Sequence, residues 1–152
     1  MRFTPDCLRF GIAFWWALLA GGGISLSPAA TFNWKAATTG DWDNPGNWVE
    51  TAVPGHGDDV YITNPGASAI LSGASSNLNA MTISKILTFT NWDTILTVTN
   101  LTILAGGLVS CAGPFTNDQM SNNVCIACSN FTLNAGGTIN ADFRGYAGGN
   151  GT

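Results

Sequence analysis

One twelve-residue motif occurs twice in this chain, 30 residues apart. Asn100–Cys111 reads NLTILAGGLVSC and Asn130–Ala141 reads NFTLNAGGTINA, so the AGG triplet and the apolar positions are kept. Strand starts related to this motif recur at intervals of 21, 20 and 30 residues: Val60, Met81, Leu101 and Phe131. Such a period is typical of a solenoid, in which each repeat is one coil stacked on the last.

Short runs from Val60 onward alternate an apolar residue with Thr, Ser or Asn, which is the pattern of half-buried strands. We therefore predict an all-β fold, a right-handed parallel β-helix of about four coils over residues 60–152. Residues 112–124 form a loop excursion from one coil, and each AGG marks a corner. The alternative is a β-sandwich or jelly roll, whose strands also arrive at short intervals.

Residues 1–30 have the organisation of a secretory signal peptide. Arg2 and Arg9 precede the apolar run Phe10–Leu26, and the small residues SPAA follow at Ser27–Ala30. We expect a secreted protein, extracellular or at the cell surface, without a membrane anchor in its mature form. The alternative is a retained anchor, which the three glycines at Gly21–Gly23 disfavour.

Residues 31–59 combine three tryptophans with many Gly, Pro, Asp and Asn residues. Turn signals such as NPG recur there and helical periodicity is absent. We predict a Trp-rich N-terminal cap, in which buried indoles supply the apolar area that a polar loop region lacks.

After residue 30, three cations face eight acidic residues, which gives a net charge of −5. The chain has no basic patch, so nucleic acid and anionic membrane surfaces are poor partners.

Three cysteines remain after the leader: Cys111, Cys125 and Cys128. Secretion permits disulfides, but three thiols cannot all pair within one chain. The favoured hypothesis is a loop staple from Cys111 to Cys125 or Cys128, with redox or zinc chemistry of the C-x-x-C as the alternative.

His56 lies beside Asp58 and Asp59 in a Pro/Gly-rich loop. A structural turn, with one Asp accepting backbone hydrogen bonds, is the favoured interpretation, and calcium on Asp58 and Asp59 is the weaker one. Apart from calcium we expect no cofactor. Carboxylates and cations are scattered rather than paired, so we expect no catalytic residues and no enzyme activity.

Exposed aromatic rings could stack on sugars, and the candidates are Trp92, Trp42 and Trp48. For the latter two a core role in the cap is the favoured alternative. Asn100 and Asn130 occupy equivalent repeat positions, where we expect an inward asparagine ladder between coils rather than glycosylation.

The first part of the mature chain resembles the start of bacterial secreted β-helix surface proteins of the autotransporter-passenger-like or PEP-CTERM-like kind. The resemblance rests on these positions: Trp34, Gly40, Trp42, Asn47, Trp48, Pro54, Asp58 or Asp59, Val60 and Ile62. It implies an N-terminal cap on a solenoid, a role as adhesin or as surface and matrix component, and no catalytic residues.

Two functions follow as hypotheses. The first is a non-enzymatic structural subunit of extracellular filaments or matrix, which associates head-to-tail through an open coil end. The second is an adhesin or glycan-binding module, either whole or as a fragment of a larger surface protein, with extracellular polysaccharide as its partner.

Overall fold

The computed structural model describes residues 28–115 and 123–145. The odd-numbered strands are β1 (Thr31–Asn33), β3 (Asp59–Ile62), β5 (Leu78–Ile83), β7 (Leu96–Ile103) and β9 (Ile126–Leu133). The even-numbered strands are β2 (Thr39–Asp41), β4 (Ser68–Leu71), β6 (Ile86–Phe89), β8 (Leu108–Cys111) and β10 (Thr138–Asn140). A 3-10 turn, Pro45–Asn47, lies between β2 and β3.

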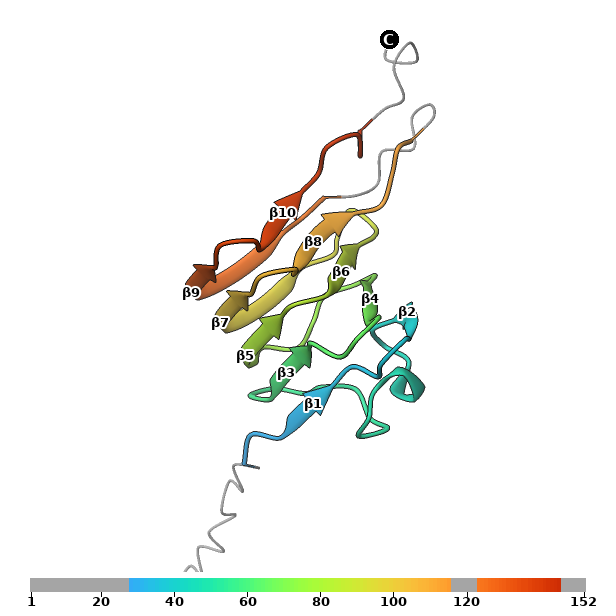
Figure 1. Cartoon of the computed structure of the whole chain (residues 1–152). Coiled ribbons are helices and arrows are strands. Elements are labelled where there is room, and N and C mark those ends of the chain that lie inside the picture. The colour runs from blue at the N-terminus through green and yellow to red at the C-terminus, as the bar shows by residue number, and fades with distance from the viewer. Residues whose placement is uncertain (1–27, 116–122, 146–152) are drawn as a thin grey trace, which may run out of the picture.

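The strands form two five-stranded sheets in which every pairing is parallel. One sheet has the order β1-β3-β5-β7-β9 and the other the order β10-β8-β6-β4-β2, so consecutive strands alternate between the sheets (Figure 1). We call each odd strand with the even strand that follows it a rung. The alternative of a sandwich or jelly roll is wrong, because those folds pair their strands antiparallel.

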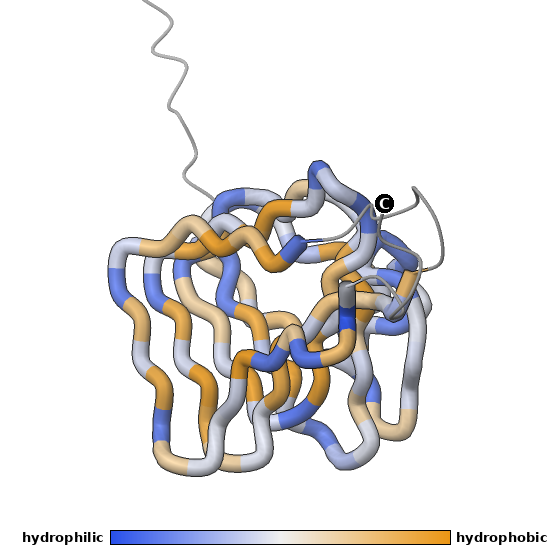
Figure 2. The backbone as a smooth tube through the Cα atoms, turned by 90° about the horizontal axis from the view of Figure 1, so that it is seen from above, coloured by the Kyte–Doolittle hydropathy of each residue, from blue (hydrophilic) through white to orange (hydrophobic). Residues whose placement is uncertain are grey.

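The repeat predicted from the sequence is the stacking register of the rungs. Val60 pairs with Met81, Met81 with Leu101, and Leu101 with Phe131. In the other sheet Ala69 pairs with Leu87, Leu87 with Val109, and Val109 with Ile139. Equivalent positions of successive repeats therefore lie directly above one another, as Figure 2 shows in a view down the stack.

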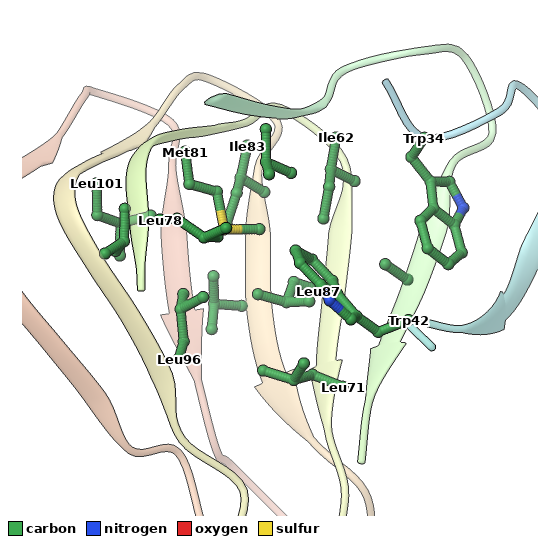
Figure 3. Packing of buried hydrophobic residues seen from close by; sticks show 14 of the residues in the cluster. Trp34, Trp42, Ile62, Leu71, Leu78, Met81, Ile83, Leu87, Leu96 and Leu101 are labelled. Atoms are coloured by element: carbon green, nitrogen blue, oxygen red, sulfur yellow. The ribbon is translucent and has the colours of Figure 1, made fainter. Parts of the chain in front are cut away.

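Alternate residues of both sheets point into a shared apolar core. Ile62, Ile83 and Ile103 occupy equivalent positions on three successive strands of the first sheet, and all three are fully buried. Phe89 and Leu87 of β6 face them from the second sheet, and Figure 3 shows the packing of this cluster. The threonines that alternate with these residues, such as Thr82 and Thr102, are half-buried on the outside.

The rungs begin earlier than the sequence suggested. β1 pairs with β3 and β2 pairs with β4, so the segment 31–59 contains a complete rung besides its turns. The described residues therefore contain five rungs: four from β3 onward, as expected for about four coils from residue 60, and one more within the segment predicted as a cap. Residues 1–27 of the predicted leader and residues 116–122 of the predicted excursion lie outside the described part.

The two AGG triplets form equivalent corners in successive rungs, between β7 and β8 and between β9 and β10. Gly106 and Gly136 have φ angles of 80° and 84°, which a side chain would strain. A Cβ atom on Gly107 would lie 2.5 Å from the Ile83 carbonyl oxygen, and one on Gly137 would lie 2.8 Å from that of Ile103. The second glycine of each corner thus lets the chain pass close over the rung below.

Within the described residues, no helix is long and apolar enough to cross a membrane.

Candidate functional site

The N-terminal end of the stack is closed by tryptophan. Trp48 is fully buried, and its ring makes edge-to-face contacts with Trp34 and Trp42, each at a centroid distance of 4.8 Å, and with Phe32 at 6.1 Å. The indole Nε1 of Trp48 donates to the Trp42 carbonyl over 2.8 Å. Trp42 and Trp48 are thus core residues of the cap, as the favoured interpretation of the sequence had it, and their buried rings leave no free face for the alternative of sugar stacking.

The outer edge of β1 is occupied by the chain that follows the 3-10 turn. The Val49 amide donates to the Asn33 carbonyl over 2.9 Å, and the Lys35 amide donates to the Asn47 carbonyl over 3.0 Å. Trp34 and Trp48 accordingly form an antiparallel bridge. The backbone of residues 47–49 therefore occupies the side of β1 that faces away from β3.

Glu50 completes this closure. Its carboxylate accepts from the Asn33 amide over 2.8 Å and from Asn33 Nδ2 over 2.9 Å. Partial burial raises the pKa of Glu50, but the hydrogen bonds from Asn33 and from the Glu50 backbone amide together outweigh it and hold the pKa below its ordinary value. The charged carboxylate thus accepts the hydrogen bond of the Asn33 amide, which a further strand would need for its own pairing.

The edge of β2 is closed by a side chain. Asn47 Nδ2 donates to the Asp41 carbonyl over 2.9 Å. A Cβ on Gly40 would lie 2.5 Å from that same Nδ2, so the close approach of Asn47 requires glycine at position 40.

The opposite end of the stack is open. β9 and β10 are the last strands of their sheets and have no strand on their outer edges among the described residues (Figure 1). Phe131 and Leu133 are 46% and 48% exposed, whereas Leu101 and Ile103 directly below them are buried. We call the outward-facing side of β9 and β10 the open edge.

The open edge presents core-type side chains to solvent. Ile126, Cys128, Phe131 and Ile139 line an apolar hollow with a volume of about 220 Å³. These residues pair with core residues of the rung below, for example Cys128 with Val98 and Ile139 with Val109. The hollow is therefore the unfilled top of the core.

An asparagine ladder runs up one side of the stack. Asn130 Nδ2 donates to Asn100 Oδ1 over 2.8 Å, and Asn100 Nδ2 donates to the Asn79 carbonyl over 3.2 Å. Asn79 Nδ2 in turn donates to Asp59 Oδ1 over 2.7 Å. The predicted ladder exists, but its side chains are exposed rather than inward, because the chain bends outward at Thr99 and Asn100.

A polar groove of about 460 Å³ crosses three rungs beside this ladder. Its polar lining residues are His56, Asn77, Thr97, Thr99 and Ser129, and the apolar part of its lining is Leu78, Val98, Ala127 and Cys128. Hydroxyls, an amide and one imidazole can bind a hydroxyl-rich molecule. The lining contains no carboxylate and no lysine or arginine.

Asp58 and Asp59 are engaged in separate structural contacts. Asp58 accepts from the Ala30 amide over 2.9 Å and from the Gly55 amide over 2.7 Å. His56 Nδ1 lies 3.0 Å from the Asn77 carbonyl. The described residues hold no group of three potential metal ligands, and the geometry favours the structural turn over a calcium site.

Trp92 is the sugar-stacking candidate that the structure leaves accessible, with 56% of its surface exposed. The loop that carries it is anchored on both sides. Asn91 Nδ2 donates to the Ser72 carbonyl over 2.8 Å, and the buried Thr94 hydroxyl donates to the Thr90 carbonyl. Trp92 does not line the polar groove, so the structure does not combine the two features into one site.

The predicted cysteine staple is not formed. Cys111, Cys125 and Cys128 are free thiols in the described part of the chain. Cys111 is buried in the core and Cys128 is exposed at the open edge.

Sequence reasoning missed Asn47 and Glu50 as the residues that close the N-terminal edge. Their positions directly after the NPG turn were the available signal. It also missed that no charged residue occurs between positions 123 and 141, which is visible in the sequence.

Comparison with known proteins gives no matching protein family, no matching curated protein and no matching solved structure.

Proposed function

We propose that this chain is a secreted, non-enzymatic structural protein, a right-handed parallel β-helix that serves as a subunit of extracellular filaments or matrix. One observation carries the proposal, which is the contrast between the two ends of the stack. The N-terminal edge is closed by Asn47, Val49 and Glu50, while the C-terminal edge exposes Phe131 and Leu133. An unpaired, uncharged strand edge is a template for another chain.

Three further features support the proposal. The alternation of parallel strands between two sheets is what a β-helix produces. The leader at residues 1–30 favours secretion. The tryptophan segment resembles the caps of bacterial secreted β-helix surface proteins, and its closed edge suits a cap.

Electron microscopy of the natively secreted protein, imaged without reductant, tests this function. We expect regular particles that contain more than one copy, and single-copy particles for the variant Leu133→Lys. Wild-type protein that shows only single-copy particles at every concentration would contradict a structural role that depends on assembly.

The exposure of Trp92 favours a second candidate, a glycan-binding module. If this function holds, Trp92→Ala keeps the fold and loses retention on immobilised extracellular polysaccharide. Equal retention of variant and wild type would remove the observation that supports this candidate.

A further inference from the structure

We infer that the open edge binds the open edge of a second copy, with the two C-terminal ends facing each other across a two-fold axis and the two β9 strands antiparallel. This inference rests on the proposed structural function and names one contact of the assembly, which we call the joint. The joint links two copies and closes on itself, so filaments or matrix would be built from such dimers through a second contact. It differs from the head-to-tail association expected from the sequence, in which the open edge of one copy meets the N-terminal end of the next.

The closed N-terminal end argues against the head-to-tail arrangement. An added strand would have to bond to the outward amide and carbonyl of Asn33. The Asn33 amide already donates to Glu50, and the Asn33 carbonyl already accepts from Val49. The apolar layer behind this edge is covered by Trp48, which leaves no hollow at this end for the side chains of the open edge.

The side-chain pattern of β9 is symmetric about its own centre. The residues that stack on the core below are Ile126, Cys128, Phe131 and Leu133, since they pair with Leu96, Val98, Leu101 and Ile103. These four positions are placed evenly about the bend at Ser129 and Asn130. An antiparallel pair centred on the bend therefore sets Ile126 opposite Leu133 of the second copy and Cys128 opposite Phe131, with every apolar side chain still facing inward.

The backbone pattern of β9 obeys the same symmetry. The Cys125 carbonyl accepts from the Leu96 amide, and the Asn134 amide donates to the Ile103 carbonyl. Because successive residues of a strand direct their backbone groups to opposite sides, Ile126 and Leu133 direct theirs away from β7. The residues that face each other in the two-fold pair are thus the ones with outward amides and carbonyls.

The distribution of charged residues also favours pairing between two open edges. Residues 123–141 carry no charged side chain, so the strands of two open edges meet without repulsion and without the lysines that usually protect an edge. The segment 31–59 has one lysine and five acids, a net charge of −4, so two N-terminal ends repel each other. Ile139 at the middle of β10 adds an apolar contact to the joint.

Sedimentation equilibrium of the secreted chain over a wide range of concentration tests the joint. We expect a monomer–dimer equilibrium that stops at the dimer, because a two-fold interface closes on itself. Leu133→Lys places a charge at the joint and should raise the dissociation constant at least about tenfold. Phe131→Lys should do the same. Near-ultraviolet circular dichroism of the buried tryptophans confirms that each variant is folded.

Val49→Lys is the matched control, since Val49 is an exposed apolar residue on the N-terminal end. We expect it to leave the dimer unchanged. Growth beyond the dimer that Val49→Lys abolishes would overturn the two-fold joint in favour of head-to-tail stacking, while the structural function would stand. A monomer at every concentration, together with multi-copy particles of the secreted material in electron micrographs, would overturn the two-fold joint alone. Single copies in both measurements would overturn the joint and the structural function together.

Discussion

At the scale of single residues, a few side chains close the N-terminal end of the stack by filling the core and by satisfying backbone groups. Trp48 fills the bottom of the core with its ring and satisfies the Trp42 carbonyl with its Nε1. Glu50 and Asn47 satisfy backbone groups that an unpaired strand edge would expose. The NPG turn places all three side chains against β1 and β2.

Trp48→Ala should lower the free energy of unfolding by about 3–5 kcal/mol, because it leaves a cavity among three aromatic rings. Trp48→Phe keeps most of the packing but leaves the buried Trp42 carbonyl without its donor, at a cost of about 1–3 kcal/mol. Chemical denaturation followed by circular dichroism measures both. The exposed Trp92→Ala is the control and should change the stability by less than about 0.5 kcal/mol.

Glu50 makes the stability of the cap depend on pH. Its folded-state pKa lies below its ordinary value, so its contribution is fully present above the unfolded pKa and is lost as the pH falls through the folded pKa. Glu50→Gln should therefore lower the Tm at neutral pH, and the difference from wild type should shrink in strong acid. The exposed Asp43→Asn serves as control. A difference that is the same at all pH values would contradict the role of the carboxylate.

At the scale of elements, the repeated AGG triplet is a corner that lets rungs stack. Its first glycine adopts a positive φ and its second passes within contact distance of the rung below. Each corner meets the same two requirements, one in its own backbone and one against the rung below, which is why the same three letters recur at both corners.

Gly107→Ala should destabilise the fold by about 1–3 kcal/mol, because its Cβ would meet the Ile83 carbonyl oxygen and Ile103 Cγ2 at 2.5 and 2.9 Å. Gly73→Ala is the matched control, since a Cβ there has no heavy atom within 4 Å. Thermal denaturation of the two variants side by side measures the difference. Equal Tm values would mean that the corner can relax and that close approach does not explain the repeat.

The strand register could be predicted from the sequence because it depends on short-range alternation and on the repeat. Three features could not. Phe32 and Trp34 alternate like other strand residues, but the turn signals around them concealed the first rung. Thr99 and Asn100 interrupt the alternation within β7, so that one bent strand reads as two short runs. The closure of the N-terminal edge depends on contacts such as Asn33 with Glu50, which no periodicity encodes.

At the scale of the whole molecule, the two ends of the stack differ in chemistry and in charge. One end holds aromatic rings, satisfied backbone groups and most of the acids. The other end holds exposed apolar residues on uncharged strands, with Asp142 and Arg144 just after β10. Such an arrangement directs association to a single end.

Amide exchange of β9, resolved by residue with nuclear magnetic resonance, tests this claim most directly. At low concentration the amides of Ala127 and Thr132, which face β7, should be protected, while those of Ile126 and Leu133 exchange rapidly. At high concentration Ile126 and Leu133 should become protected as well. Rapid exchange of these two amides at every concentration, or their protection already in the monomer, would contradict the open edge as the joint between copies.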